Sequence, residues 1–191
     1  PYLSQSAFGG QEALFARAFP LPRKEDPEFA VYCRKSRAGL GGDALFRALQ
    51  GRFPGQSWQT WPEELKNREP EALETARLEL DEDVTRAAGR QYVFWKAWQQ
   101  IRRAARDRGI TLLGDMPLFG APDSADVGAH RELVQLDGDG YPTEVAGVPP
   151  DYFSRTGQVW GNPLYNWQAM QKENWRRWQE RFQVLATEAD S

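Results

Sequence analysis

GITLLGD, residues 109–115, decides the fold class of this chain, because a helical pattern ends there and a strand-like pattern begins. From about Glu71 to Arg108 charged residues are dense, and apolar residues recur at helical spacings. Gly109 is placed to end this helix in the left-handed conformation. Ile110 to Leu113 then form a short apolar run that is typical of a buried strand. This succession predicts an α/β protein.

Asp115 comes directly after that predicted strand. A carboxylate at the C-terminal end of a buried parallel strand is where (β/α) barrels place active-site residues. Such a group must be paired, be hydrogen bonded or face a cleft, so a structural salt bridge stays an alternative role. Asp123 and Asp126, in the run APDSADV, are typical of turns and helix caps, and we expect them to be structural.

The stretch VAGVPPDYFSRTGQVWGNPLY, residues 145–165, is too rich in proline and glycine for a packed helix. We expect an irregular loop whose aromatic faces can lie on a sugar ring and whose polar groups can bond its hydroxyls. The aromatic candidates are Tyr152, Phe153, Trp160 and Tyr165, and the polar ones are Asp151, Gln158 and Asn162. Packing of the same aromatics as a small satellite core is the alternative.

Two further elements flank this loop. Paired Asp-Gly dipeptides within residues 133–145 predict a β-hairpin, and a helix is predicted from Asn166, as its N-cap, to Ala186. Tryptophans at helical spacing are expected in the core rather than on sugar; these are Trp95, Trp98, Trp175 and Trp178.

Composition excludes several classes of partner. A net charge of −3, with Lys and Arg dispersed among acids, argues against nucleic acid and anionic membranes as partners. Cys33 is the single cysteine and His130 the single histidine, so we predict no disulfide within the chain, no metal site and no catalytic triad. Without a signal peptide or a long apolar span, we expect a cytoplasmic protein.

Three segments together resemble one enzyme family. Residues 147–167, GVPPDYFSRTGQVWGNPLYNW, are similar to the signature loop of amylomaltases, the 4-α-glucanotransferases that disproportionate maltooligosaccharides. PYLSQSAFGG, residues 1–10, resembles their SPY-x-S-x-SAF loop, and GDMPLFGAPDSADV, residues 114–127, resembles their strand-three segment. The resemblance implies a fragment of a (β/α)8 TIM barrel, mostly helical, with an inserted helical subdomain and a small β-hairpin subdomain.

The resemblance also implies a division of the chain within one larger catalytic domain. The expected parts are a loop and inserted helical subdomain at 1–83, barrel helix and strand three at 84–119, the inserted β-hairpin and substrate loop at 120–165, and a barrel helix at 166–191. Both ends fall where such a protein would be expected to continue, so we expect a fragment.

Maltooligosaccharides or other α-1,4-glucans are the ligands that the resemblance implies, without any cofactor. The implied substrate-binding residues are Tyr2, Asp115, Asp151, Tyr152, Phe153, Gln158 and Trp160. Among these, Tyr2 and Asp115 would hold a glucosyl unit near the cleavage point, and Asp151, Gln158 and Trp160 would line donor or acceptor sites. Tyr152 and Phe153 would form the tip of a mobile loop over the cleft.

The catalytic carboxylates are expected outside this chain. Cleavage with retention needs a carboxylate nucleophile and a carboxylic acid roughly 5 to 5.5 Å apart. The family's nucleophile lies in an Arg-Ile-Asp-His motif that this sequence lacks, and its general acid lies further downstream. We therefore predict an inactive piece that could self-associate through its uncovered apolar face. An α-amylase-like hydrolase and a non-catalytic carbohydrate-binding or scaffold module are the alternative functions.

Three positions depart from the family pattern. Gly128 stands where the family usually has Trp, Gly120 replaces a larger apolar residue, and Gln11-Glu12 replace Asn-Pro. Loss of the Trp would remove a large apolar contact, so we expect a looser loop or a smaller partner around Gly128.

Overall fold

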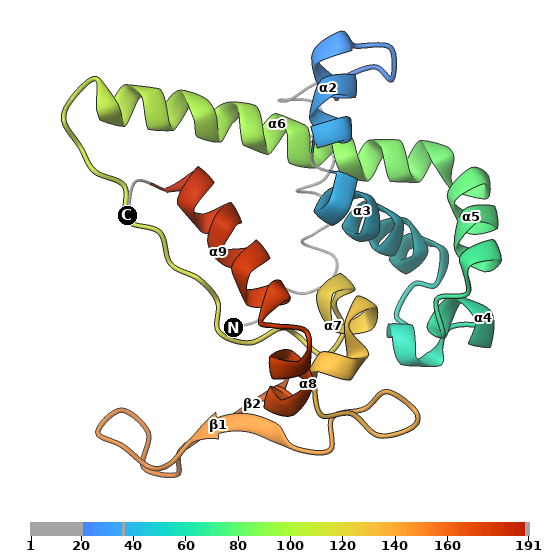
Figure 1. Ribbon diagram of the computed structural model, residues 1–191, viewed down its shortest axis with the longest axis vertical. Helices are drawn as coiled ribbons and strands as arrows, with labels where there is room; N and C mark the ends of the chain where they lie inside the picture. The colour runs from blue at the N-terminus through green and yellow to red at the C-terminus, as the bar shows by residue number, and fades with distance from the viewer. Residues whose placement is uncertain (1–20, 36, 190–191) are drawn as a thin grey trace.

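The chain is mostly helical, as predicted (Figure 1). The computed structural model describes residues 21–35 and 37–189. Its α-helices are α2 (Pro27–Lys35), α3 (Arg37–Arg52), α4 (Glu63–Lys66), α5 (Pro70–Glu79), α6 (Asp81–Arg106), α7 (Ala125–Ala129), α8 (Trp167–Lys172) and α9 (Arg176–Glu188). Two 3₁₀ turns, η1 (Trp58–Thr60) and η2 (Arg131–Leu133), and two strands, β1 (Val145–Val148) and β2 (Gln158–Pro163), complete the regular structure.

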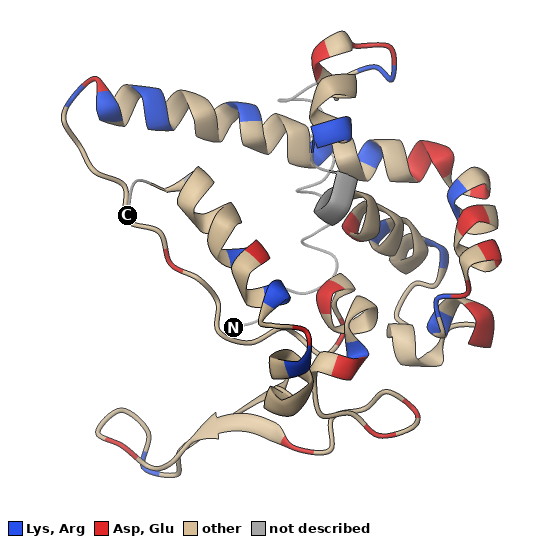
Figure 2. Cartoon of the chain, in the orientation of Figure 1, with Lys and Arg blue, Asp and Glu red and all other residues tan. Residues whose placement is uncertain are grey.

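The long helix α6 forms one edge of the molecule, and α3 packs along it (Figure 1). Its first turn is acidic and its last turn is basic, which suits the helix dipole at both ends (Figure 2). The prediction of a single helix from Glu71 to Arg108 is wrong at Leu80, which has φ −106° and ψ 23° and separates α5 from α6. Leu80 packs against the core there, so burial of its side chain outweighs helix continuity.

The main core lies where α3, η1, α7 and α8 meet. Its buried residues are Leu45, Phe46, Leu49, Trp58, Trp61, Ala76, Val127, Leu133, Val134, Tyr165 and Met170. A smaller cluster of Phe29, Ala44, Ala88 and Tyr92 joins α2 and α3 to α6. Segments far apart in the sequence therefore share one interior.

Trp58 is the centre of the main core. Its side chain is 2% exposed, its indole N–H donates to the Pro122 carbonyl at 2.8 Å, and the Arg131 guanidinium lies 4.4 Å from its ring centre. Gly128 faces this ring, and a Cβ on it would lie 3.7 Å away, in ordinary contact. Of the two outcomes expected at Gly128, a smaller partner is not found, because the large rings of Trp58 and Phe46 face this buried glycine.

The predicted buried strand at Ile110 to Leu113 is wrong for this chain. Residues 110–117 have no regular secondary structure, and Leu113 is 81% exposed. A parallel strand is held only by its neighbours, and the strands of the described residues, β1 and β2, pair with each other. The helix end before it is correct, since Gly109 has a φ of 66°.

The paired Asp-Gly dipeptides form the turn of a short hairpin, as predicted: Asp137 N donates to Tyr141 O at 2.8 Å, and Thr143 N donates to Gln135 O at 3.1 Å. Asp137 Oδ1 accepts from the backbone N–H groups of Asp139 at 3.0 Å and Tyr141 at 2.9 Å. Beyond the turn, Leu136 and Pro142 form an isolated antiparallel bridge. A further hairpin, which was not predicted, is built by β1 and β2 inside the stretch for which an irregular loop was expected.

The last predicted helix begins correctly and is broken in the middle. Asn166 Oδ1 accepts from Ala169 N at 3.1 Å, as an N-cap does. Asn174 and Trp175 have φ values of 55° and 58°, and Trp175 N donates back to Met170 O at 2.9 Å. Asparagine tolerates this left-handed conformation and ends α8.

Only part of the expected tryptophan core is found. Trp178 is half-buried and packs against the main core, and Trp98 is also half-buried. Trp95 is 37% exposed and Trp175 is 40% exposed, so neither is a core residue in this chain.

Candidate functional site

The hairpin β1–β2 carries most of the predicted site residues and lies at the opposite end of the molecule from α6 (Figure 1). Gly147 pairs with Val159 and Val148 with Gln158 in an antiparallel register. The turn closes at Gly157, which has a φ of 74° and where a Cβ would lie 2.5 Å from the Val148 carbonyl oxygen. Glycine is therefore required at that position for the tip to fold back on β1.

Asp151 organises the tip of the hairpin. Its Oδ1 accepts from the backbone N–H groups of Phe153 at 2.9 Å and Ser154 at 2.6 Å. Tyr152 is 96% exposed and Phe153 is 91% exposed, with their rings edge to face at 5.6 Å. One oxygen of Asp151 thus fixes the turn that presents two aromatic rings to solvent.

Gln158 and Trp160 lie on one face of β2, two residues apart. Gln158 Oε1 accepts from the Trp160 indole N–H at 3.1 Å, which fixes the ring relative to the amide. Trp160 is 48% exposed, and its ring meets Phe119 edge to face, with 6.3 Å between the ring centres. An indole that is held in place and about half open is suited to stacking on the apolar face of a sugar.

Phe119 is a supporting residue that the sequence reasoning missed. Phe119 lies shortly after Asp115 in the sequence. Its ring stacks on that of Tyr165, with 5.9 Å between the ring centres and an interplanar angle of 17°. The signal in the sequence was a large apolar residue, Phe119, shortly after the predicted strand-end carboxylate, Asp115.

Two residues that were expected to face a sugar make contacts with other parts of the chain. Tyr165 is 7% exposed, because its ring lies between Phe119 and the helices α8 and α9. The Asn162 side-chain amide donates to the Gly120 carbonyl at 2.9 Å. Tyr165 is therefore a core residue, the alternative role for the aromatics of this stretch, whereas Asn162 is half-buried and its ligand contact stays a prediction.

Asp115 lies apart from the hairpin. It is exposed and borders a hollow of about 710 Å³ between α6, the segment before α7 and the end of α9. The hollow is lined by Tyr32, Arg90, Gln91, Phe94, Trp95, Trp98, Leu113, Gly114, Asp115, Leu185 and Ala189. No hairpin residue borders it. Tyr2, which was expected to act with Asp115, lies outside the described residues.

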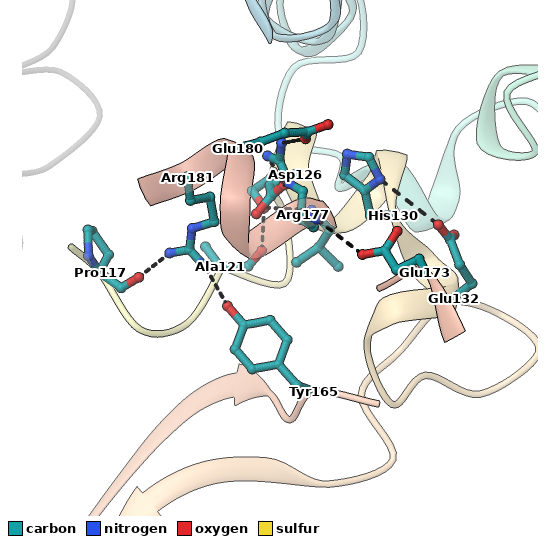
Figure 3. Close-up of polar contacts among 12 residues, drawn as sticks. Pro117, Ala121, Asp126, His130, Glu132, Tyr165, Glu173, Arg177, Glu180 and Arg181 are labelled. Carbon is teal, nitrogen blue, oxygen red and sulfur yellow. Dashed lines mark hydrogen bonds and ion pairs between the residues drawn. The ribbon is translucent and has the colours of Figure 1, made fainter. Parts of the chain in front are cut away.

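The acids expected to be structural are structural. Asp123 Oδ1 accepts from Trp58 N at 3.2 Å. Asp126 pairs with Arg177 of α9 at 2.5 Å (Figure 3). Burial disfavours the charged guanidinium, but the charge of Asp126 and hydrogen bonds to Asp126 and Glu180 outweigh it and raise the pKa of Arg177. This ion pair ties α9 to α7.

The sequence pattern that defines the 4-alpha-glucanotransferase family matches residues 6–191. The chain belongs to this family. The 4-alpha-glucanotransferase of Thermus thermophilus is 44% identical over 160 residues, which are 84% of this chain and 32% of that protein. The enzyme of Aquifex aeolicus is 48% identical over 135 residues, 71% of this chain and 28% of that protein. The chain thus spans about a third of the length of these relatives.

The fold agrees with that family. A solved structure of amylomaltase from Streptococcus agalactiae in complex with acarbose matches 97% of this chain and 37% of its own, with a TM-score of 0.81 and 30% identity. This likeness supports the coarse prediction of a TIM-barrel-type enzyme fragment. Within the described residues no helix is long and apolar enough to cross a membrane.

Proposed function

We propose that this chain is part of a 4-α-glucanotransferase that transfers α-1,4-glucan segments between maltooligosaccharides with retention of configuration. The hairpin surface of Asp151, Tyr152, Phe153, Gln158 and Trp160 binds the glucan. Asp115, which borders the hollow, binds a glucosyl unit together with Tyr2.

The observation that carries this proposal is the geometry of Trp160. Its indole N–H is held by Gln158, its ring meets Phe119 edge to face, and about half of its surface is open. The similar amylomaltase of Streptococcus agalactiae was solved in complex with acarbose, which supports the same ligand here.

The catalytic carboxylates of this enzyme lie outside the chain in our proposal, so these residues bind and orient the glucan. An exposed hairpin tip with two aromatic rings can close over bound sugar and exclude water. Water exclusion favours transfer to an acceptor sugar over hydrolysis.

The finer assignments belong to the same proposal. The parts at 1–83, 84–119, 120–165 and 166–191 form one catalytic domain of a cytoplasmic enzyme. Exposed apolar side chains beside the hollow, such as Phe94 and Leu113, give the isolated chain a surface for self-association.

Incubation with maltotriose tests the proposal. The intact protein that carries this chain should yield both glucose and oligosaccharides longer than maltotriose, and the 191-residue chain alone should yield neither. Shorter sugars without longer ones would identify a hydrolase. A folded intact protein that binds maltotriose without converting it would identify a binding module.

A further inference from the structure

The segment that follows Asp115 is held by side chains from the C-terminal part of the chain. Tyr165 Oη donates to the Leu118 carbonyl at 2.5 Å. The Arg181 guanidinium of α9 donates to the Pro117 carbonyl (Figure 3). The Asn162 side-chain amide donates to a third carbonyl of this segment, that of Gly120. Because this segment has no strand or helix pairing, these side chains supply its fixed points.

The two main donors act as one unit. Arg181 Nη1 donates to Tyr165 Oη at 2.7 Å, so the hydroxyl accepts one hydrogen bond while it donates another. The same guanidinium lies over the Trp178 ring, 4.9 Å from its centre. Because the Arg181 guanidinium is charged, its hydrogen bond to Tyr165 strengthens the hydrogen bond that Tyr165 donates to the Leu118 carbonyl.

This unit also reaches the hairpin. The Tyr165 ring stacks on Phe119 at 5.9 Å, and Phe119 in turn supports Trp160 at 6.3 Å. One side chain therefore holds the backbone beyond Asp115 by its hydroxyl and the support of Trp160 by its ring. Tyr165 therefore links the two separated parts of the candidate site, beside the Asn162–Gly120 hydrogen bond.

We propose that Tyr165 and Arg181 are positioning residues that set the placement of Asp115 relative to Trp160 for glucan transfer. They touch no substrate and act through Pro117, Leu118 and Phe119. The expected fall in kcat/KM rests on the proposed function. The expected placement of residues 117–119 rests on the hydrogen bonds of Tyr165 and Arg181.

Three variants of the intact protein test this: Tyr165→Phe, Arg181→Lys and the double variant. Tyr165→Phe keeps the ring and removes only the hydroxyl. We expect kcat/KM for maltotriose disproportionation and the affinity for acarbose to fall by about tenfold or more, because a misplacement of about 1 Å can cost up to a hundredfold. The double variant should be no worse than the more damaged single variant, since the pair acts as a unit.

Arg177→Lys is the matched control. Arg177 lies on the same helix and bonds Asp126, Glu173 and Glu180, none of which belongs to residues 117–119. It should lower the unfolding temperature and leave kcat/KM within about twofold of the parent. If Tyr165→Phe does not fold, Arg181→Lys alone carries the test.

Amide hydrogen exchange separates this inference from the proposed function. Tyr165→Phe should speed exchange at residues 118–121, and Arg177→Lys should not. An active parent whose Tyr165 and Arg181 variants keep kcat/KM within twofold overturns the inference. If the parent acts on no glucan, the proposed function fails. Faster exchange in the variants then still supports the positioning role, and unchanged exchange overturns it.

Discussion

Trp58 and Trp160 both stand next to glycine- and proline-rich loops, yet one is sealed inside the molecule and the other is half open. Trp58 is 2% exposed and meets groups from residues 122 to 140, far along the chain. Trp160 is 48% exposed, and its indole N–H is held by Gln158 of its own strand. The number of distant segments that close around an aromatic ring decides whether it stabilises the fold or stays available to a ligand.

Removal of the buried Trp58 ring should have the largest effect on the free energy of unfolding. Trp58→Ala is expected to lower the free energy of unfolding by about 3–5 kcal/mol, as large-to-small changes at buried aromatics do. Urea unfolding followed by far-UV circular dichroism measures it. Trp58→Phe, which keeps an apolar ring, should lose clearly less. A loss below about 1 kcal/mol for the alanine variant would mean that Trp58 is not the centre of the core.

The turn that closes over Trp58 gives the second prediction. Gly140 has a φ of 89°, and a Cβ there would lie 2.6 Å from Trp58 Cη2. Gly140→Ala should therefore combine left-handed strain with overpacking, for a loss of about 2–4 kcal/mol in the same urea experiment. Gly138, in the same turn, has no atom within 4 Å of its Cβ position. Equal losses for Gly138→Ala and Gly140→Ala would show that the contact with Trp58 is irrelevant.

Local signals in the sequence were sufficient for some element ends. Gly109 and the N-cap Asn166 act where they were predicted, because each depends on its own backbone and a few neighbours. The strand at Ile110 to Leu113 could not be judged in this way, since a strand needs partners and, among residues 21–35 and 37–189, the two strands β1 and β2 pair with each other. The break at Asn174 and Trp175 was hidden by an apolar spacing that continues across it.

The site was predictable in its residue types and less so in its geometry. Asp151, Gln158 and Trp160 are exposed on the hairpin, where a ligand could reach them, and their binding of sugar stays a prediction. Tyr165 looked equivalent in sequence, but its hydroxyl bonds a carbonyl 47 residues away. Only tertiary structure distinguishes an aromatic residue that faces solvent from one that anchors a distant segment.

The open ring gives the third prediction. Trp160→Ala should lower the affinity for acarbose of the intact protein by about tenfold, or about 1.4 kcal/mol, through loss of stacking, while its unfolding free energy changes by less than about 1 kcal/mol. Isothermal calorimetry and urea unfolding measure the two quantities. Val159→Ala is the control, because Val159 is 83% exposed on the opposite face of β2. Loss of stability without loss of affinity would reverse the assigned roles of Trp58 and Trp160.

The smallest effects on stability are expected from two aspartates that each accept hydrogen bonds from backbone N–H groups, one beside Trp58 and one at the hairpin tip. Asp123 Oδ1 accepts from Trp58 N at 3.2 Å, and Asp151 Oδ1 accepts from two amides of the exposed tip. Asp123→Ala should cost about 1 kcal/mol, because the freed N–H is partly buried beside Trp58. Asp151→Ala should cost roughly 0.5 kcal/mol or less, since water replaces the lost acceptor at the tip. Urea unfolding of both variants makes the comparison, and hydrogen exchange at Phe153 and Ser154 should rise only in the second. An Asp151 variant that lost as much stability as the Asp123 variant would mean that the tip is part of the folding core, and that the hairpin is not free to close over a glucan.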